Sequence, residues 1–180
     1  MAFLRKLAAI LLVLLPSAVA TATASPSEYQ LKAVFLFNFA AFVEWPGNAF
    51  AAPDAPFTIC VLGDDPFGEN LDAAVRGESV AGHPLAVKRY RSAREVEACQ
   101  ILFIGGSELG QLDSILSGLG GRSILTVSDI ARSAERGAII QFANDRNRVR
   151  LRINVAAARS AGLTLSSKLL RPAEIVGGEG

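Results

Sequence analysis

A glycine-rich segment in the middle of the chain holds the serine that most resembles a catalytic nucleophile. Gly105-Gly106-Ser107-Glu108-Leu109-Gly110 follows an apolar run and opens an amphipathic one, which is the setting of a nucleophile elbow. The elbow pattern G-x-S-x-G fails because Leu109 stands where the second glycine is needed. The single histidine, His83, lies in a Gly-His-Pro turn. Ser107 is therefore interpreted as a helix cap with Glu108 in the first turn, and no catalytic residue is predicted.

Two adjacent carboxylates, Asp64 and Asp65, form another candidate site, for a cation or for acid–base chemistry. They follow an apolar run and precede Pro66, a context that favours a turn and a helix cap. One histidine and two cysteines nearly exclude a structural zinc site. Neither the G-x-G-x-x-G fingerprint nor the P-loop spacing occurs. The sequence thus predicts no metal and no cofactor.

Positive side chains gather in two places near the C-terminus. Arg148, Arg150 and Arg152 alternate with apolar residues, so they share one face of a predicted strand. Such a row could hold an anionic ligand or partner, but more often it is a solvated edge that prevents pairing between sheets. Lys168 and Arg171 are three residues apart on a predicted helix, where a solvated helix end is the default interpretation.

The composition favours a single folded domain that does not bind nucleic acid. Of 180 residues, 51% are apolar and 19% are charged, which is too hydrophobic for a disordered chain. The 18 Lys and Arg residues barely exceed the 17 Asp and Glu residues, so no basic excess exists to neutralise phosphates.

The first 24 residues have the layout of a secretory signal peptide. Arg5 and Lys6 precede an apolar run over residues 7–15, and two small-x-small cleavage patterns follow at 18–20 and 22–24. A membrane anchor is the alternative, but nine helical residues reach only roughly 14 Å, about half of a hydrocarbon core. We therefore expect residues 25–180 to form an exported domain.

Export bears on Cys60 and Cys99, the only two cysteines in the sequence. An oxidising compartment favours a disulfide between them, and two free buried thiols are the alternative.

Strand-like and helix-like segments alternate along the exported part. This order predicts a single α/β domain with a mostly parallel central sheet flanked by helices and an antiparallel edge hairpin. Ligands bind at the carboxyl ends of such strands, so residues 63–65, 105–107 and 128–129 should share one rim. The predicted strands are 57–62, 85–87, 101–104 and 124–127, with the hairpin at 138–142 and 148–154. The predicted helices are 28–45, 66–75, 92–98, 107–119, 130–134, 156–161 and 166–176.

The long N-terminal helix, over residues 28–45, is unusually aromatic. It begins after a serine cap at Ser25 or Ser27 and ends before Pro46. Its apolar residues point nearly all round, which indicates burial on two sides. One side can be the domain core and the other a partner, with Phe37 and Trp45 as anchors. The alternative, in which all the rings fill the core, remains open.

The order of these segments resembles that of the YfiR-like periplasmic repressor family. The resemblance begins with Lys-Ala-Val-Phe-Leu-Phe-Asn-Phe-Ala at 32–40 and Phe-Val-Glu-Trp-Pro at 42–46. It covers about residues 27 to 176, and no single motif carries it. The later matching segments are 59–63, 65–68, 99–104, 124–129, 148–150, 153–154, 161–163 and 166–170.

The resemblance implies an exported regulator rather than an enzyme. Members of the family can dimerise, and the best-known one restrains an inner-membrane diguanylate cyclase by contacting its periplasmic sensor domain. An outer-membrane protein can sequester that repressor, small ligands have been proposed to modulate it, and related proteins occur beside sensor kinases. Cys60 and Cys99 match one family disulfide, whereas a second pair has no counterpart here.

From this resemblance we expect a periplasmic homodimer that binds the sensor domain of a diguanylate cyclase or sensor kinase. The alternative is a periplasmic small-ligand-binding accessory of a sensor kinase or transport system, without catalysis. The expected partner-binding residues are Phe37, Phe39, Phe42 and Trp45. The expected ligand-binding residues are Ser166, Ser167, Lys168 and Arg171.

Overall fold

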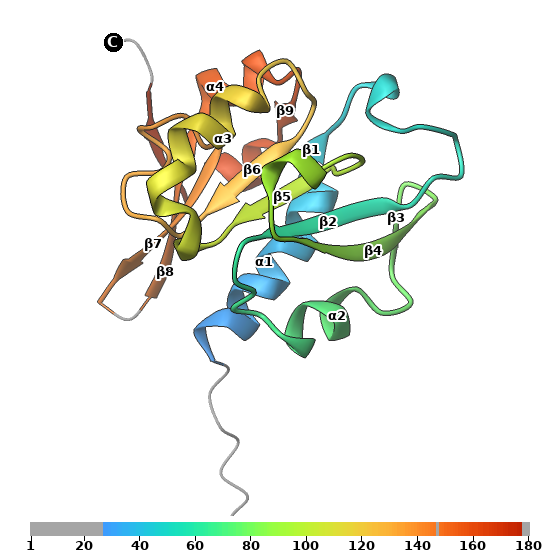
Figure 1. Cartoon of the computed structure of the whole chain (residues 1–180), viewed down its shortest axis with the longest axis horizontal. Helices are drawn as coiled ribbons and strands as arrows, with labels where there is room; N and C mark the ends of the chain where they lie inside the picture. Colours follow the sequence, from blue (N-terminus) through green and yellow to red (C-terminus); the bar gives the residue numbers. More distant parts are fainter. Residues whose placement is uncertain (1–26, 147, 178–180) are drawn as a thin grey trace, which may run out of the picture.

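A computed structural model describes residues 27–146 and 148–177 (Figure 1). The predicted signal peptide over residues 1–24 lies outside the described residues. The helices are α1 (Glu28–Phe42), α2 (Glu69–Val75), α3 (Leu112–Gly118), α4 (Val155–Ser160) and α5 (Ser167–Leu170), with 3-10 turns η1 (Gly47–Ala49), η2 (Ala93–Glu95) and η3 (Gly106–Gln111). The strands are β1 (Val43–Glu44), β2 (Phe57–Leu62), β3 (Ser79–Val80), β4 (His83–Tyr90), β5 (Ile101–Ile104), β6 (Leu125–Ser128), β7 (Ile140–Asp145), β8 (Arg148–Asn154), β9 (Thr164–Leu165) and β10 (Glu174–Val176).

The described strands form one large sheet in the order β10-β8-β7-β6-β5-β2-β4-β3. The central pairs are parallel, from β4 through β2, β5 and β6 to β7. The hairpin of β7 and β8 is antiparallel, as is the short pair of β3 and β4 at the other end. The predicted α/β class, mostly parallel sheet and antiparallel hairpin are confirmed, and β1 and β9 add a small second sheet.

The central strands are buried on both faces because each carries apolar side chains in both directions. In β2, Ile59 and Val61 contribute to one core cluster, while Cys60 and Leu62 contribute to the other. β5 divides in the same way, with Phe103 on the first side and Leu102 on the second. Such strands read as uninterrupted apolar runs in the sequence, which is typical of a parallel sheet covered by helices.

Different helices cover the two faces. The first cluster includes side chains of α1, α2, α4 and α5, and the second is closed by α3 and the segment around η2. Figure 1 shows α1 running behind the strands, with α3 on the viewer's side. The two faces therefore present separate surfaces to solvent, one built on α1 and one built on α3.

α1 begins where the sequence predicts and ends earlier. The Ser27 hydroxyl accepts a hydrogen bond from the Gln30 backbone N–H, and Gln30 Oε1 accepts one from the Ser27 N–H, which completes a capping box. The helix ends at Phe42 because Val43 turns extended and pairs with Leu165 of β9. The prediction of helix as far as residue 45 is therefore wrong in its last turn.

Other elements also differ from the prediction, and the predicted helix 92–98 is only the 3-10 turn η2. Residues 130–134 form turns rather than a helix. The predicted helix 166–176 stops at Leu170, and Glu174–Val176 instead pairs in parallel with β8 as strand β10. The strand forms because β8 offers free backbone groups there, which is information that the local sequence does not contain. β10 covers only Arg152–Asn154, so the first half of β8 keeps an open edge.

Candidate functional site

The outward side of α1 exposes an apolar surface. Leu31 is 40% exposed and Val34 is 47% exposed, although both are large apolar side chains. Phe37 is half-buried and Ala41 is exposed. Their spacing of three or four residues puts these four on one side of the helix. We call this surface of Leu31, Val34, Phe37 and Ala41 the outer α1 face.

The predicted partner-binding rings divide between this face and the core. Phe37 lies on the outer α1 face, whereas Phe42 and Trp45 are half-buried and pack against the core. Phe39 is 1% exposed and stacks on Phe142, so the structure places it in the core rather than on the outer α1 face. Phe39 lies opposite the outer face because two residues advance a helix by about 200°.

A buried charge cluster anchors α1 to the sheet. The Lys32 side chain is buried, and its Nζ lies 2.7 Å from Asp129 Oδ2 and 2.7 Å from Glu28 Oε1. The Tyr29 hydroxyl donates to the same Asp129 oxygen at 2.9 Å. Burial disfavours the charged ammonium, but the hydrogen bonds to Asp129 and Glu28 outweigh it and raise the pKa of Lys32. Burial and the hydrogen bond to Asp129 both raise the pKa of Tyr29.

The predicted rim exists at the carboxyl ends of the parallel strands. The Ser107 hydroxyl accepts a hydrogen bond from the Asp64 backbone N–H at 3.0 Å and donates to Glu108 Oε1 at 3.1 Å. The Ser128 hydroxyl donates to the Ile104 carbonyl at 2.8 Å. Residues 63–65, 105–107 and 128–129 are therefore brought together, as predicted.

The backbones after β2 and β5 meet so closely that glycine is required. Gly63 has a φ of +87°, and a Cβ there would lie 2.3 Å from the Ser107 hydroxyl oxygen. A Cβ on Gly105 would lie 2.9 Å from the Asp64 carbonyl oxygen. These contacts explain both glycines as packing requirements of the rim rather than as parts of a nucleophile elbow.

The rim does not contain a catalytic pair of Ser107 and His83. His83 lies at the start of β4, whereas the rim lies at the other ends of the parallel strands. His83 stacks on Phe50 with ring centroids 4.0 Å apart. Its Nδ1 is 2.7 Å from the Ala55 carbonyl oxygen. Ser107 was expected to cap a helix, but Gly105 precedes η3 and the Ser107 hydroxyl binds the Asp64 N–H instead.

Asp64 and Asp65 do not form a metal site. The Asp65 carboxylate accepts the Phe67 backbone N–H at 2.8 Å and pairs with Arg89 Nε at 2.6 Å. The predicted turn role of Asp65 is confirmed, but α2 begins later, after Gly68. Over residues 27–146 and 148–177, no group of His, Cys, Asp and Glu side chains is arranged to hold a metal ion.

The C-terminal cations are mostly engaged or solvated. Arg152 contacts Glu135 Oε1 at 2.5 Å and Glu174 Oε1 at 2.6 Å, so its charge is neutralised. Of the predicted ligand-binding residues, Ser166 caps α5 by accepting the Lys168 N–H, and Ser167, Lys168 and Arg171 are exposed. Their role in ligand binding stays a prediction.

A hollow of about 260 Å³ next to α1 is lined by both ring and aliphatic side chains, and no motif in the sequence predicted it. Trp45, Phe50, Phe57 and His83 contribute to its wall. The indole Nε1 of Trp45 is buried and has no hydrogen-bond partner among the described residues. A buried donor without an acceptor is rare in folded proteins.

The cysteines form the predicted disulfide. Cys60 of β2 is bonded to Cys99, just before β5, across a sequence separation of 39. Both residues lie in the core cluster on the α3 side of the sheet. Within the described part of the chain, no helix has the length and apolar character needed to cross a membrane.

Comparison with known proteins gives one informative result. The family model described as YfiR/HmsC-like matches residues 29–174, which is most of the chain and nearly all of the described domain. A search of curated proteins finds no match.

Proposed function

The chain belongs to the YfiR/HmsC-like family, and from this premise we propose that it is an exported regulator without catalytic activity. In this proposal it binds the periplasmic sensor domain of an inner-membrane diguanylate cyclase and lowers the synthesis of cyclic di-GMP. In a variant of this proposal, the bound sensor domain belongs to a sensor kinase, and the regulated activity is that of the kinase. Homodimerisation and sequestration by an outer-membrane protein complete the regulatory cycle.

The observation that carries the proposal is the outer α1 face. Leu31 and Val34 are among the few large apolar side chains that are exposed in the described domain, and they lie one helical turn apart. Phe37 and Ala41 continue the surface along the helix. Neighbouring exposed apolar side chains indicate an interaction site, and a helix that offers anchors at this spacing fits an apolar groove of a partner.

The buried cluster of Lys32, Asp129 and Tyr29 supports docking through this helix. It fixes the inward side of α1 to the end of β6, so the outer α1 face is presented in one orientation. A surface that is ordered before binding loses less entropy when the complex forms. The free protein therefore already has the shape that the partner recognises.

The first test measures cellular cyclic di-GMP in the host with and without the gene. Deletion should raise cyclic di-GMP, and the wild-type gene should restore the lower level. The variant Val34→Asp should be exported and folded but should not restore it, because a carboxylate would be buried in the apolar contact. The matched control is Leu109→Asp, since Leu109 is 55% exposed on η3 and distant from α1.

The outcomes separate the alternatives. If deletion leaves cyclic di-GMP unchanged, a diguanylate cyclase is not the partner. If Val34→Asp represses as well as the wild type, the outer α1 face is not the docking surface. If Val34→Asp makes a dimer monomeric in sedimentation but still represses, the same face joins two copies of this chain instead.

The hollow next to α1 supports a second candidate function, the binding of a small aromatic ligand. The rings of Trp45 and Phe50 line the hollow and would contact an aromatic ligand bound there. A rise in melting temperature with an aromatic carboxylate such as benzoate, lost in Phe50→Ala, would favour this function. No rise at saturating benzoate would count against it.

A further inference from the structure

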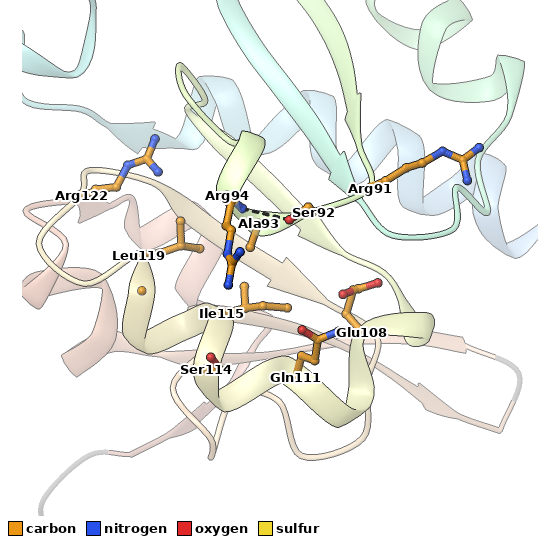
Figure 2. Close-up of a pocket in the computed structure, with 11 residues that line it drawn as sticks. Arg91, Ser92, Ala93, Arg94, Glu108, Gln111, Ser114, Ile115, Leu119 and Arg122 are labelled. Atoms are coloured by element: carbon orange, nitrogen blue, oxygen red, sulfur yellow. Dashed lines mark hydrogen bonds between the residues drawn. The ribbon is translucent and has the colours of Figure 1, made fainter.

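A second hollow lies on the other face of the sheet, between α3 and the turn that carries η2 (Figure 2). Its volume is about 380 Å³, within the range of small-molecule sites. Figure 2 shows Arg94 pointing from the turn toward Ile115, with Gln111 at the end of η3 and Ser114 on α3 nearby. Arg122 lies at the end near Leu119. We call this hollow the α3 groove.

The lining of the α3 groove is positively charged. Three arginines, Arg91, Arg94 and Arg122, are among its lining residues, together with one acid, Glu108. Figure 2 shows the Arg94 side chain reaching toward α3, whereas the Arg91 side chain points away from it. Among residues 27–146 and 148–177, Arg91 and Arg94 have no ion-pair partner. The acid on the same turn, Glu95, accepts the backbone N–H groups of Arg91 and Ser92 rather than a guanidinium. The groove therefore has a cationic excess that its own residues do not neutralise.

Arg122 is held in place without losing its charge. Its guanidinium donates to the Val96 carbonyl at 2.9 Å and to the Glu97 carbonyl. Carbonyl oxygens orient a guanidinium but do not neutralise its charge. A guanidinium has five N–H donors, and these two contacts do not use all of them. Donors thus remain for an oxyanion.

The turn that carries Arg94 is fixed at both ends. Ser92 and Glu95 close a capping box around η2. The disulfide joins Cys99 to β2, and the Arg122 hydrogen bonds hold the backbone at Val96 and Glu97. Because the backbone of this turn is already ordered, binding an anion there costs less entropy.

The topology of the sheet also marks this region. The connection from β2 through α2 leads to β4 on one side of β2, whereas β5 lies on its other side. The connections from β2 and β5 also use opposite faces, so the chain diverges at the carboxyl ends of these two strands. In open α/β sheets ligands bind in the crevice at such a point. A smaller hollow there shares Arg91 and Glu108 with the α3 groove.

We propose that the α3 groove binds a small organic oxyanion, a carboxylate or phosphate ester on a compact apolar body. Arg94 and Arg122 bind the oxyanion, because guanidinium forks match carboxylate and phosphate geometry. Gln111 and Ser114 supply neutral hydrogen bonds, and Ile115 and Leu119 contact the apolar body. Glu108 opposes binding through charge repulsion and favours ligands that keep their anionic group near Arg94. This inference does not rest on the proposed function, since the groove and α1 lie on opposite faces of the sheet.

The test is calorimetric titration of the full exported domain with phenyl phosphate at low ionic strength. The wild type should bind it, and Arg94→Gln should weaken binding about tenfold or more, because a charge-assisted hydrogen bond is lost. Glu108→Gln should strengthen binding, because it removes the repelling charge. The matched control is Arg76→Gln, which makes the same charge change at an exposed position after α2, on the other face.

Each outcome decides the proposal. Absence of phenyl phosphate binding at millimolar concentration would overturn it, as would equal weakening by Arg94→Gln and Arg76→Gln. Weaker binding of phenyl phosphate in Glu108→Gln would contradict the assigned charge repulsion between Glu108 and the anion. Inorganic phosphate should bind more weakly than phenyl phosphate, and equal affinity would refute the role of Ile115 and Leu119.

Discussion

The contact between Lys32 and Asp129 offers the sharpest test of how α1 is held. Replacing Asp129 with alanine removes the buried acceptor of both the Lys32 ammonium and the Tyr29 hydroxyl. Lys32 is 3% exposed, so its charge cannot reach water without moving the helix. In the Asp129→Ala variant, the buried ammonium of Lys32 therefore keeps only one of its two carboxylate partners, Glu28.

The size of the effect follows from what remains. Loss of one partner from a fully buried ion pair costs about 3–5 kcal/mol. Glu28 still lies 2.7 Å from Lys32 Nζ, but 43% of its side chain is exposed, so it compensates only in part. We expect Asp129→Ala to lower the free energy of unfolding by about 2–3 kcal/mol. For a domain of this size the melting temperature should fall by about 5–10 °C.

The assay is urea denaturation of the exported domain, followed by circular dichroism. The double variant Lys32→Met/Asp129→Ala should be more stable than Asp129→Ala alone, because methionine fills similar space and leaves no charge to bury. The control Asp54→Ala changes an exposed loop carboxylate and should alter stability by less than about 0.5 kcal/mol.

Two results would refute this reasoning. If Asp129→Ala unfolds at the same urea concentration as the wild type, the buried cluster does not stabilise the attachment of α1. If the double variant is less stable than Asp129→Ala, the cost comes from lost packing of the lysine stem and not from an unpaired charge.

Two further predictions concern the disulfide and acid stability. Cys60→Ala/Cys99→Ala should lower the free energy of unfolding by about 2–4 kcal/mol, because the bond closes a long loop. Dithiothreitol should destabilise the wild type to a similar extent in urea denaturation and leave the double variant unchanged, and the same loss in both would contradict the prediction. The hydrogen bond from Arg89 lowers the pKa of Asp72 in the folded protein below its ordinary value of 3.8. The ion pair therefore stabilises the fold fully above pH 3.8, and this stabilisation is lost as the pH falls through the lowered pKa. Asp72→Asn should therefore lower stability at pH 7 by only about 0.5 kcal/mol, because the pair is partly exposed, and should have a progressively smaller effect as the pH falls through the lowered pKa. Thermal denaturation over a pH series measures this, and an effect of equal size at every pH would argue against it.

The sequence was most informative where local pattern and tertiary environment agree. The strands Phe57–Leu62 and Ile101–Ile104 were predicted to the residue, because an uncharged apolar run can be satisfied only in the middle of a covered sheet. The hairpin of β7 and β8 was predictable from the alternation along its second strand. The start of α1 was predictable because Ser27 and Gln30 cap it locally.

The pattern of α1 does not say which rings face the core. Apolar residues surround that helix, so Phe37 and Phe39 are equivalent in the sequence, and only packing against Phe142 assigns Phe39 to the interior. The burial of Lys32 was equally hidden, because its partner Asp129 is 97 residues away in the chain.

The sequence by itself determined the α/β class, the family, the central strands and the rim at their carboxyl ends. These follow from short-range periodicity and from glycines that no other residue can replace. The tertiary structure alone decided the strand at Glu174–Val176, the outer α1 face and the α3 groove. The groove is the clearest case, because Arg94 and Arg122 are ordinary surface cations in the sequence. They become one wall only when a disulfide, two backbone carbonyls and α3 bring distant segments together.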